Sequence, residues 1–286
     1  MNSRPDPLGA RSGLEAPARA ALAGTRFARI DWVAEIGSTN TVLLDAAAQG
    51  APDGTVLVTD HQSAGRGTKG RTWFDPPGAS LLVSVLVRPA VALEAVHRTT
   101  LAFGLAAVEA VRDLGAEGVG LKWPNDVFAG VDGPDGPQER KLAGILAESR
   151  LAGGRVDAVV IGMGMNVHRP DDLPADIVDT AASLDRLVAG PVDRCELLVS
   201  ILRRFEVWID RIGTDGGRND GTDLLDAYRA ASCTLGRTVR LELPGGVPAV
   251  VGRAVDVTPE GHLVVEVDGV RRTYASADVE HLRNAG

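Results

Sequence analysis

We predict an α+β protein in which a mixed β-sheet carries helices and a small β-barrel follows. Up to about residue 233, buried β-branched runs alternate with amphipathic stretches, a pattern typical of a sheet covered by helices. From Thr234 the sequence changes to short alternating strands separated by glycine turns, which indicates a small barrel. We therefore divide the chain into a loose N-terminal arm (residues 1–29), a main domain (30–233) and a C-terminal barrel domain (234–286).

The main domain opens with regular elements that the apolar spacing marks clearly. We expect a short helix around 14–23 within the arm and a strand over 30–36. Ser38 then stands as a plausible N-cap of a helix that runs through Ala48. Two buried strands and a long helix follow, over 55–60, 80–88 and 93–114.

The second half of the main domain combines long strands with less regular segments. A short strand leads into Lys122, and the Gly/Pro/Asp-rich stretch 130–140 is expected to hold no regular structure. Strands over 142–150 and 156–166 follow. After a Pro/Asp-rich crossover at 169–179, we expect two or three helices between 181 and 231, interrupted by a loop at 213–221.

The composition excludes several classes of protein. Hydrophobic residues make up 44% of the chain and charged residues 24%, and no apolar run approaches the roughly 20 residues of a membrane span. A net charge of −8 argues against a nucleic-acid backbone as the main partner, because phosphate binding needs a concentrated basic face. Cys195 and Cys233 are isolated, and no signal peptide opens the chain, so we expect a cytoplasmic protein with reduced thiols.

Lysine is rare, and its positions are informative. Arginine supplies 27 of the 30 positive charges, and the only lysines are Lys69, Lys122 and Lys141. All three fall in segments marked by glycine or tryptophan. Because guanidinium cannot imitate a compact ammonium on a flexible stem, we expect these lysines to contact a ligand. Chance placement is the alternative.

A glycine-rich segment, HQSAGRGTKGRTW, runs from His61 to Trp73. Residues 65–70 match G-x-G-x-x-G, but prolines and a strand follow where a dinucleotide fold needs a helix, and the other kinase motifs are lacking. We predict a loop between strands in which Gly65, Gly67 and Gly70 let backbone N–H groups approach an anion, with Arg66, Lys69 and Arg71 supplying charge. A plain surface loop is the alternative.

Two short segments place polar groups beside possible ligand walls. In KWPND, Trp123 offers an aromatic wall, while Asn125 and Asp126 can meet a base edge or a metal-bound phosphate. The alternative is that the KWPND segment forms a simple turn. In GSTN, two hydroxyls and an amide meet at a helix start, whereas N-capping alone explains only Ser38.

Two strands add single polar residues. Lys141 opens the strand KLAGILAES, in which Gly144 leaves room for a ligand. The alternative is that Lys141 is an ordinary surface residue. GMGMNV ends an apolar strand with Asn166, whose amide either contacts a ligand or caps the strand.

Taken in order, GSTN, HQSAGRGTKGRTW, KWPND, KLAGILAES and GMGMNV resemble the motifs of the biotin–protein ligases, with similar spacing from about Ile30 to the C-terminus. The resemblance implies the class II synthetase-like catalytic fold of biotin ligases plus an SH3-like β-barrel. It also implies ATP- and Mg²⁺-dependent activation of biotin as biotinyl-5'-AMP. The biotin is then transferred to one lysine of the biotin carboxyl-carrier domain of a biotin-dependent carboxylase.

The resemblance and the motif chemistry together nominate site residues. The catalytic residues would be Lys141 and Arg66. The biotin-binding residues would be Ser38, Thr39, Asn40, Gln62, Gly65, Arg66, Gly67, Thr68, Trp73, Lys141 and Gly144. The nucleotide-binding residues would be Lys122, Trp123, Asn125, Asp126, Asn166 and Arg237, with Asp126 the candidate for contact to a metal.

The chain departs from the family pattern in its glycine loop. Family members usually carry a second arginine where this chain has Thr68, and the hypothesis is that Lys69 retains the acyl-phosphate in its place. Some members also begin with a winged helix-turn-helix. The arm of residues 1–29 is too short for one, so no DNA-binding role is expected.

Two rival functions remain at this stage. A lipoate–protein ligase shares the fold and the acyl-adenylate chemistry, but it would need a wider apolar tunnel in place of the polar set that includes Asn40 and Gln62. A ligand-sensing repressor without catalysis is the rival from another class. For a ligase, a carboxylate must attack the α-phosphate of ATP, so two anions must meet where cations and backbone donors stabilise the charge.

Overall fold

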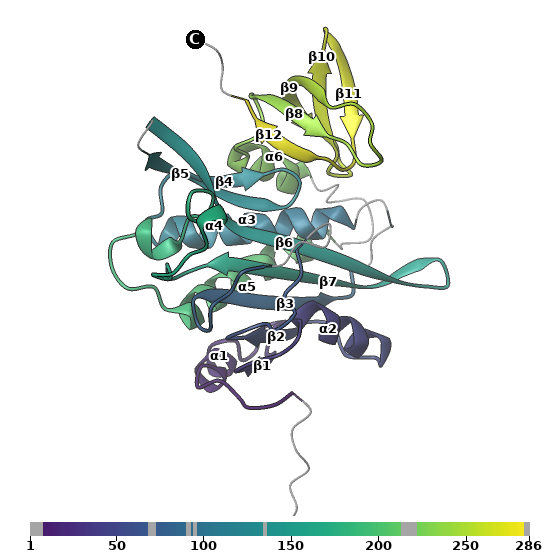
Figure 1. The fold of residues 1–286 in the computed structure, drawn as a ribbon. Helices are drawn as coiled ribbons and strands as arrows, with labels where there is room; N and C mark the ends of the chain where they lie inside the picture. Colours follow the sequence, from purple (N-terminus) through teal and green to yellow (C-terminus); the bar gives the residue numbers. More distant parts are fainter. Residues whose placement is uncertain are drawn as a thin grey trace, which may run out of the picture.

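The structure, a computed structural model, describes residues 8–67, 73–89, 93, 96–133, 136–212 and 222–282. Figure 1 shows two sheets. The larger is seven-stranded, in the order β1 (Arg29–Val33), β2 (Thr55–Thr59), β3 (Ser80–Val87), β7 (Arg155–Asn166), β6 (Gly136–Ala152), β5 (Asp126–Gly133), β4 (Val119–Lys122). β1 and β2 pair in parallel, and the remaining neighbours are antiparallel. The predicted mixed sheet is confirmed.

The second sheet contains the C-terminal strands and lies beside β4 and α6 (Figure 1). It is antiparallel throughout, in the order β11 (Val270–Tyr274), β10 (Leu263–Val267), β9 (Val250–Val257), β8 (Thr238–Glu242), β12 (Asp278–His281). The predicted change to short strands after Thr234 is thus confirmed. SH3-like closure of these strands, and the domain boundary, stay predictions.

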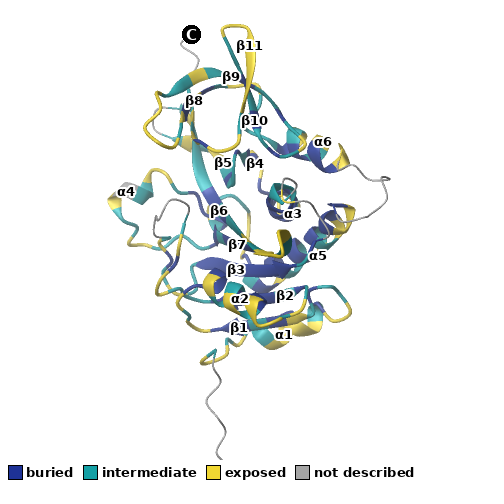
Figure 2. Ribbon diagram, turned by 90° about the vertical axis from the view of Figure 1, so that its right-hand side faces the viewer, coloured by how far each residue is buried: buried dark blue, intermediate teal, exposed yellow. Residues whose placement is uncertain are grey.

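The helices cover both faces of the large sheet. They are α1 (Glu15–Ala21), α2 (Thr39–Ala48), α3 (His97–Asp113), α4 (Ala175–Val178), α5 (Arg194–Ile212) and α6 (Thr222–Ala231), with a 3₁₀ turn at Leu184–Arg186. Alternate β3 residues, among them Val83 and Val85, join the core under α3 and α5. Leu86 points to the other face and packs with Leu43 of α2. Figure 2 shows this buried interior between the layers. The apolar alternation of β3 therefore fixes which face carries which helix.

The N-terminal segment is not a loose arm from Leu8 onward, so that prediction is wrong for the described part. The short helix predicted there is present as α1, and Ala18, Leu22 and Phe27 are fully buried. The rings of Phe27 and Phe205 stack with centroids 5.5 Å apart. Apolar burial therefore holds this segment against the sheet and α5.

The stretch 130–140 was predicted to be irregular, and this prediction is wrong. Its described residues, 130–133 and 136–140, belong to two paired antiparallel strands in which Gly130 faces Glu139 and Asp132 faces Pro137. Gly136 has φ +98°, a conformation that glycine tolerates at a hairpin turn. The glycines and prolines therefore mark the ends of two long strands.

Other predicted boundaries need smaller corrections. The long helix begins at His97 in place of Leu93, and the crossover contains the short helix α4. The predicted loop at 213–221 lies outside the described residues. Among the described helices, none has the length and apolarity needed to cross a membrane.

Candidate active site

A row of glycines forms the floor of the site, on the face of the sheet that carries α2. Gly162 of β7 lies between Ser84 of β3 and Leu146 of β6, and the next row places Gly164 beside Gly144. A Cβ on Gly162 would lie 2.1 Å from Asn40 Oδ1, and one on Gly164 would lie 2.7 Å from a ring carbon of Trp73. Only glycine at these positions lets side chains from other elements lie on the sheet.

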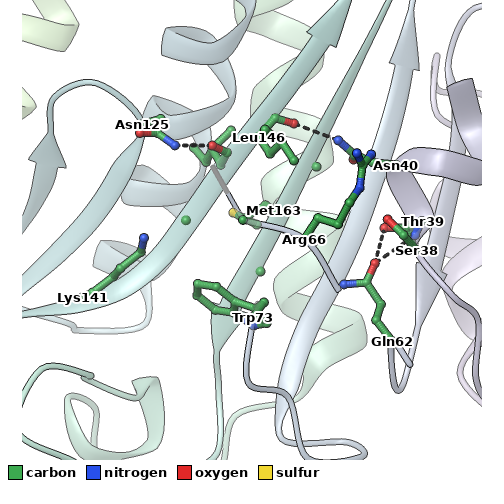
Figure 3. Close-up of a pocket in the computed structure, with 15 residues that line it drawn as sticks. Ser38, Thr39, Asn40, Gln62, Arg66, Trp73, Asn125, Lys141, Leu146 and Met163 are labelled. Atoms are coloured by element: carbon green, nitrogen blue, oxygen red, sulfur yellow. Dashed lines mark hydrogen bonds between the residues drawn. The ribbon is translucent and has the colours of Figure 1, made fainter. Parts of the chain in front are cut away.

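Above this floor lies a pocket (Figure 3). It gathers nine of the eleven residues that the sequence nominated for biotin and catalysis, together with Asn125 and five sheet residues that were not nominated. Its lining comprises Ser38, Thr39, Asn40, Gln62, Arg66, Gly67, Trp73, Asn125, Lys141, Gly144, Ile145, Leu146, Gly162, Met163 and Gly164.

One end of the pocket is a hydrogen-bonded cluster of short polar side chains. Gln62 Oε1 accepts from the backbone N–H of Thr39 at 2.9 Å and lies 3.1 Å from Thr39 Oγ1. Ser84 Oγ lies 2.7 Å from Thr39 Oγ1 and 2.6 Å from Asn40 Oδ1. Asn40 Nδ2 donates to Leu146 O at 3.1 Å and to Glu148 Oε2 at 2.9 Å.

The direction of these bonds follows from their partners. Asn40 must turn Nδ2 toward Leu146 O and Glu148, because its oxygen would be repelled by two acceptors. Oδ1 therefore accepts the single Ser84 proton, and the Thr39 hydroxyl donates to Ser84 or to Gln62. One Asn40 lone pair and the Gln62 Nε2 amide remain for a ligand. This end offers both a donor and an acceptor.

Ser38 occupies the N-cap position of α2, as predicted, but its side chain makes no capping hydrogen bond. The residue is 7% exposed and lines the pocket. N-capping therefore does not explain this serine, whereas its position in the pocket wall is consistent with the prediction that it contacts a ligand.

The other end of the pocket carries the charged groups. Lys141 Nζ lies 2.7 Å from Asp126 Oδ1 and 5.7 Å from the centre of the Trp73 ring. Asn125 Nδ2 donates to Ile145 O at 2.5 Å, and Asn125 O accepts from Ile145 N at 2.8 Å. These bonds fix Asn125 against the edge of β6 while the ammonium of Lys141 stays one-third exposed.

Arg66 connects the glycine-rich segment to the polar end. Its Nη2 lies 3.0 Å from Glu148 Oε2, the oxygen that also accepts from Asn40. Gly65 lies close to Gln62, since an added Cβ would be 3.3 Å from its Nε2. Thr68 and Lys69 lie outside the described residues.

Asn166 lies next to this pocket and lines a neighbouring cavity with Phe74 and Ser183. Its Nδ2 donates to Ala182 O at 3.0 Å. The Asn166 amide therefore joins the end of β7 to the following segment, as the alternative of a strand cap predicts. Asn166 nevertheless also lines a cavity.

Three nominated nucleotide residues lie away from the pocket. Lys122 and Arg237 line a separate cavity between the two sheets, where Arg237 pairs with Glu139 at 2.7 Å. Burial lowers the pKa of Lys122. Trp123 is 1% exposed, so the interpretation as an aromatic wall for a ligand is wrong in this structure. Its indole is covered by the C-terminal domain, which short-range sequence signals do not show.

Two polar residues of the site were not anticipated from the sequence, Ser84 and Glu148. Ser84 lies at the centre of the apolar strand SLLVSVLV, and Glu148 lies near the end of the largely apolar run LAGILAES. A buried polar group needs a partner, so this pattern was a usable signal.

Among the described residues no group of three or more His, Cys, Asp or Glu is arranged to hold a metal.

Two protein-family models and several known proteins match this chain. Residues 32–166 match the biotin/lipoate A/B protein ligase family, and residues 234–282 match the biotin protein ligase C terminal domain. The biotin–[acetyl-CoA-carboxylase] ligase of Mycobacterium tuberculosis is 41% identical over 267 residues, which cover 91% of this chain and 92% of that protein. The bifunctional ligase/repressor BirA of Bacillus subtilis is 30% identical over 86% of this chain and 71% of its own length.

A solved structure extends the likeness to the whole fold. The biotin protein ligase from Aquifex aeolicus, in complex with biotin and ATP, matches with a TM-score of 0.73 at 26% identity, covering 90% of this chain and 100% of that one. This chain therefore belongs to the biotin protein ligases of the biotin/lipoate A/B protein ligase family.

Proposed function

We propose that the protein is an ATP-dependent ligase that activates biotin as biotinyl-5'-AMP and transfers it to a lysine of a biotin carboxyl-carrier protein. One observation carries this proposal: a single pocket joins the polar cluster of Thr39, Asn40 and Gln62 to the charged end of Lys141. The M. tuberculosis relative is named as a biotin–[acetyl-CoA-carboxylase] ligase. The carrier domain of such a carboxylase is accordingly the expected protein substrate.

The polar end suits a ureido ring. A ureido group presents one carbonyl acceptor and two N–H donors, and this end of the pocket offers Gln62 Nε2 as donor and Asn40 Oδ1 as acceptor. The dithiolane ring of lipoate has no hydrogen-bonding group, so it would leave the Gln62 Nε2 donor unpaired at a cost of about 1–3 kcal/mol and the remaining Asn40 lone pair unused. This contrast favours biotin over lipoate.

The charged end suits adenylate formation. A carboxylate oxygen of biotin attacks the α-phosphorus of ATP, and the bond to pyrophosphate breaks. Lys141 would stabilise the charge that builds up there, exchanging its contact to Asp126 for the phosphate. Asn125 and Asp126 would face the nucleotide, and Mg²⁺ arriving with ATP would use Asp126 as its protein carboxylate, since Mg²⁺ in nucleotide sites takes one or two carboxylates beside the phosphates.

The second half-reaction transfers the acyl group. The carrier lysine amine attacks the acyl carbon, loses a proton and displaces AMP. Water must stay out until then, and the glycine-rich segment around Arg66 is suited to that task because glycines permit closure over a ligand. We place the protein in the cytoplasm, where carboxylases and reduced thiols occur.

Pyrophosphate release tests the proposal directly. The purified protein is mixed with ATP, Mg²⁺ and either biotin or lipoate. We expect release with biotin and none with lipoate. Release with lipoate alone would make the protein a lipoate ligase, and biotin binding without release would make it a non-catalytic sensor. A carrier domain whose acceptor lysine is replaced by arginine serves as the control for transfer.

A further inference from the structure

The C-terminal domain holds one residue of the main domain by both of its N–H groups. Trp123 donates its backbone N–H to Thr234 Oγ1 at 3.1 Å and its indole Nε1–H to Gly261 O at 2.8 Å. The side chain is 1% exposed. Because both donors end on the second domain, the position of Trp123 depends on how that domain docks.

The docking turn lies between β9 and β10 and fits closely against α3. Gly261 has φ +85°, and a Cβ there would lie 2.1 Å from His97 Cδ2. Arg98 Nε donates to Pro259 O at 2.9 Å. The turn is thus fixed between the start of α3 and the indole of Trp123, and only glycine allows this approach.

The chain on the other side of Trp123 enters the active site at once. Only Pro124 separates it from Asn125, which is bonded to β6 through Ile145. Asp126 follows and holds Lys141 at 2.7 Å. Proline has a fixed φ, so a shift of Trp123 passes to Asn125 with little chain between to absorb it.

We propose that Trp123 is a positioning residue through which the C-terminal domain sets Asn125 and Asp126 for adenylate formation. This inference rests on the proposed function. Two further links, from Arg237 and His281, both meet Glu139 across the junction at 2.7 Å, and none of these three residues lines the pocket. The docking turn therefore contributes to the reaction through Trp123, without touching a substrate.

The test compares two glycines of the C-terminal domain. Gly261→Ala should lower kcat for biotin-dependent pyrophosphate release by roughly tenfold to a hundredfold, since small misplacements of reacting groups have costs of that size. The affinity for biotin alone should stay unchanged, because the cluster around Asn40 and Gln62 belongs to other elements.

Gly245→Ala is the matched control. Its φ of +84° gives the same backbone strain, but no atom lies within 4 Å of the added Cβ, and its kcat should equal that of the wild type.

Two further variants separate docking from general damage. Trp123→Phe keeps an aromatic ring but removes the Nε1–H donor, and it should lower kcat without changing biotin affinity. Gly261→Ala combined with His97→Ala makes room for the new methyl group and should recover part of the lost kcat.

The outcomes distinguish this inference from the proposed function. If Gly261→Ala keeps the wild-type kcat, or if Gly245→Ala loses as much, the positioning role is refuted while the ligase function stands. The positioning role is also refuted, and the ligase function again stands, if biotin affinity falls together with kcat in both Gly261→Ala and Trp123→Phe. Wild-type protein that releases no pyrophosphate with biotin refutes the ligase function, and this inference with it.

Discussion

Asn40 and Glu148 are joined by a hydrogen bond of 2.9 Å from Nδ2 to Oε2, although 108 residues separate them in the chain. The same carboxylate oxygen lies 3.0 Å from Nη2 of Arg66. One carboxylate thus orients the amide at the polar end of the pocket and the arginine of the glycine-rich segment. Both proposed functions of the pocket, ring recognition and closure over the reacting groups, would therefore depend on Glu148.

We predict that Glu148→Gln weakens biotin binding by roughly tenfold, about 1.4 kcal/mol. The neutral amide loses the charge-assisted bond to Arg66 and can turn its own donor toward Asn40, which would reverse that amide. Calorimetric titration with biotin measures the change. Asp157→Asn is the control, because Asp157 also pairs with arginines, Arg88 and Arg150, but lies outside the pocket. Equal biotin affinities in wild type and Glu148→Gln would contradict the assigned role.

Lys141→Ala should nearly abolish adenylate formation and leave the fold intact. Loss of one charge that stabilises the transition state typically costs about 3 kcal/mol, roughly a hundredfold in rate. The backbone of Lys141 stays tied at both sides, to Thr180 O and Ala182 N, each at 2.8 Å. Arg150→Ala, on the same strand, is the control. Pyrophosphate release close to the wild-type rate would remove Lys141 from the mechanism.

Gly162→Ala should weaken biotin binding by roughly tenfold or more, since it displaces Asn40 and leaves buried polar groups without partners. The added methyl group would lie 2.1 Å from Asn40 Oδ1 and 3.1 Å from Ser84 Oγ. Gly130→Ala provides the comparison within the same sheet, because its nearest atom would be 3.8 Å away. A Gly162→Ala variant that binds biotin as the wild type does would show that the floor can relax.

Much of this architecture was predictable because strands and amphipathic helices carry their period in the sequence. The strand at β3, for example, follows from eight buried apolar or small residues in succession. The hairpin at 130–140 was not predictable in this way, because its glycines and prolines are also loop residues. Pairing across it depends on the register of Val127 and Phe128 with β6, which short-range signals do not contain.

The site was predictable where several motifs had to converge and not where a residue met a distant element. Asn40, Gln62 and Lys141 were nominated and do share one pocket. Trp123 was assigned to the nucleotide as an aromatic wall, yet its partner Gly261 is 138 residues away. Packing between the two domains decides whether a residue of a motif lines the pocket or is buried. The short sequence of the motif contains no information about that packing.

His97 should make stability depend on pH in a defined window. Burial lowers the pKa of His97 from 6.5 to about 4, and the charge of the neighbouring His262 acts in the same direction. The unfolded chain binds a proton below pH 6.5 that the folded chain refuses until about pH 4. Stability is therefore complete above pH 6.5 and falls as the pH drops toward 4, by about 3 kcal/mol in total from this group.

Urea unfolding between pH 7 and pH 4 measures this effect when the wild type is compared with His97→Gln. Carboxylates titrate in both proteins, so the difference between their free energies of unfolding isolates the imidazole. We expect the wild type to lose about 3 kcal/mol more than the variant across this range, because only the wild type must keep a buried neutral imidazole beneath Gly261. Parallel curves for the two proteins would mean that His97 takes up its proton in the folded state as readily as in the unfolded chain.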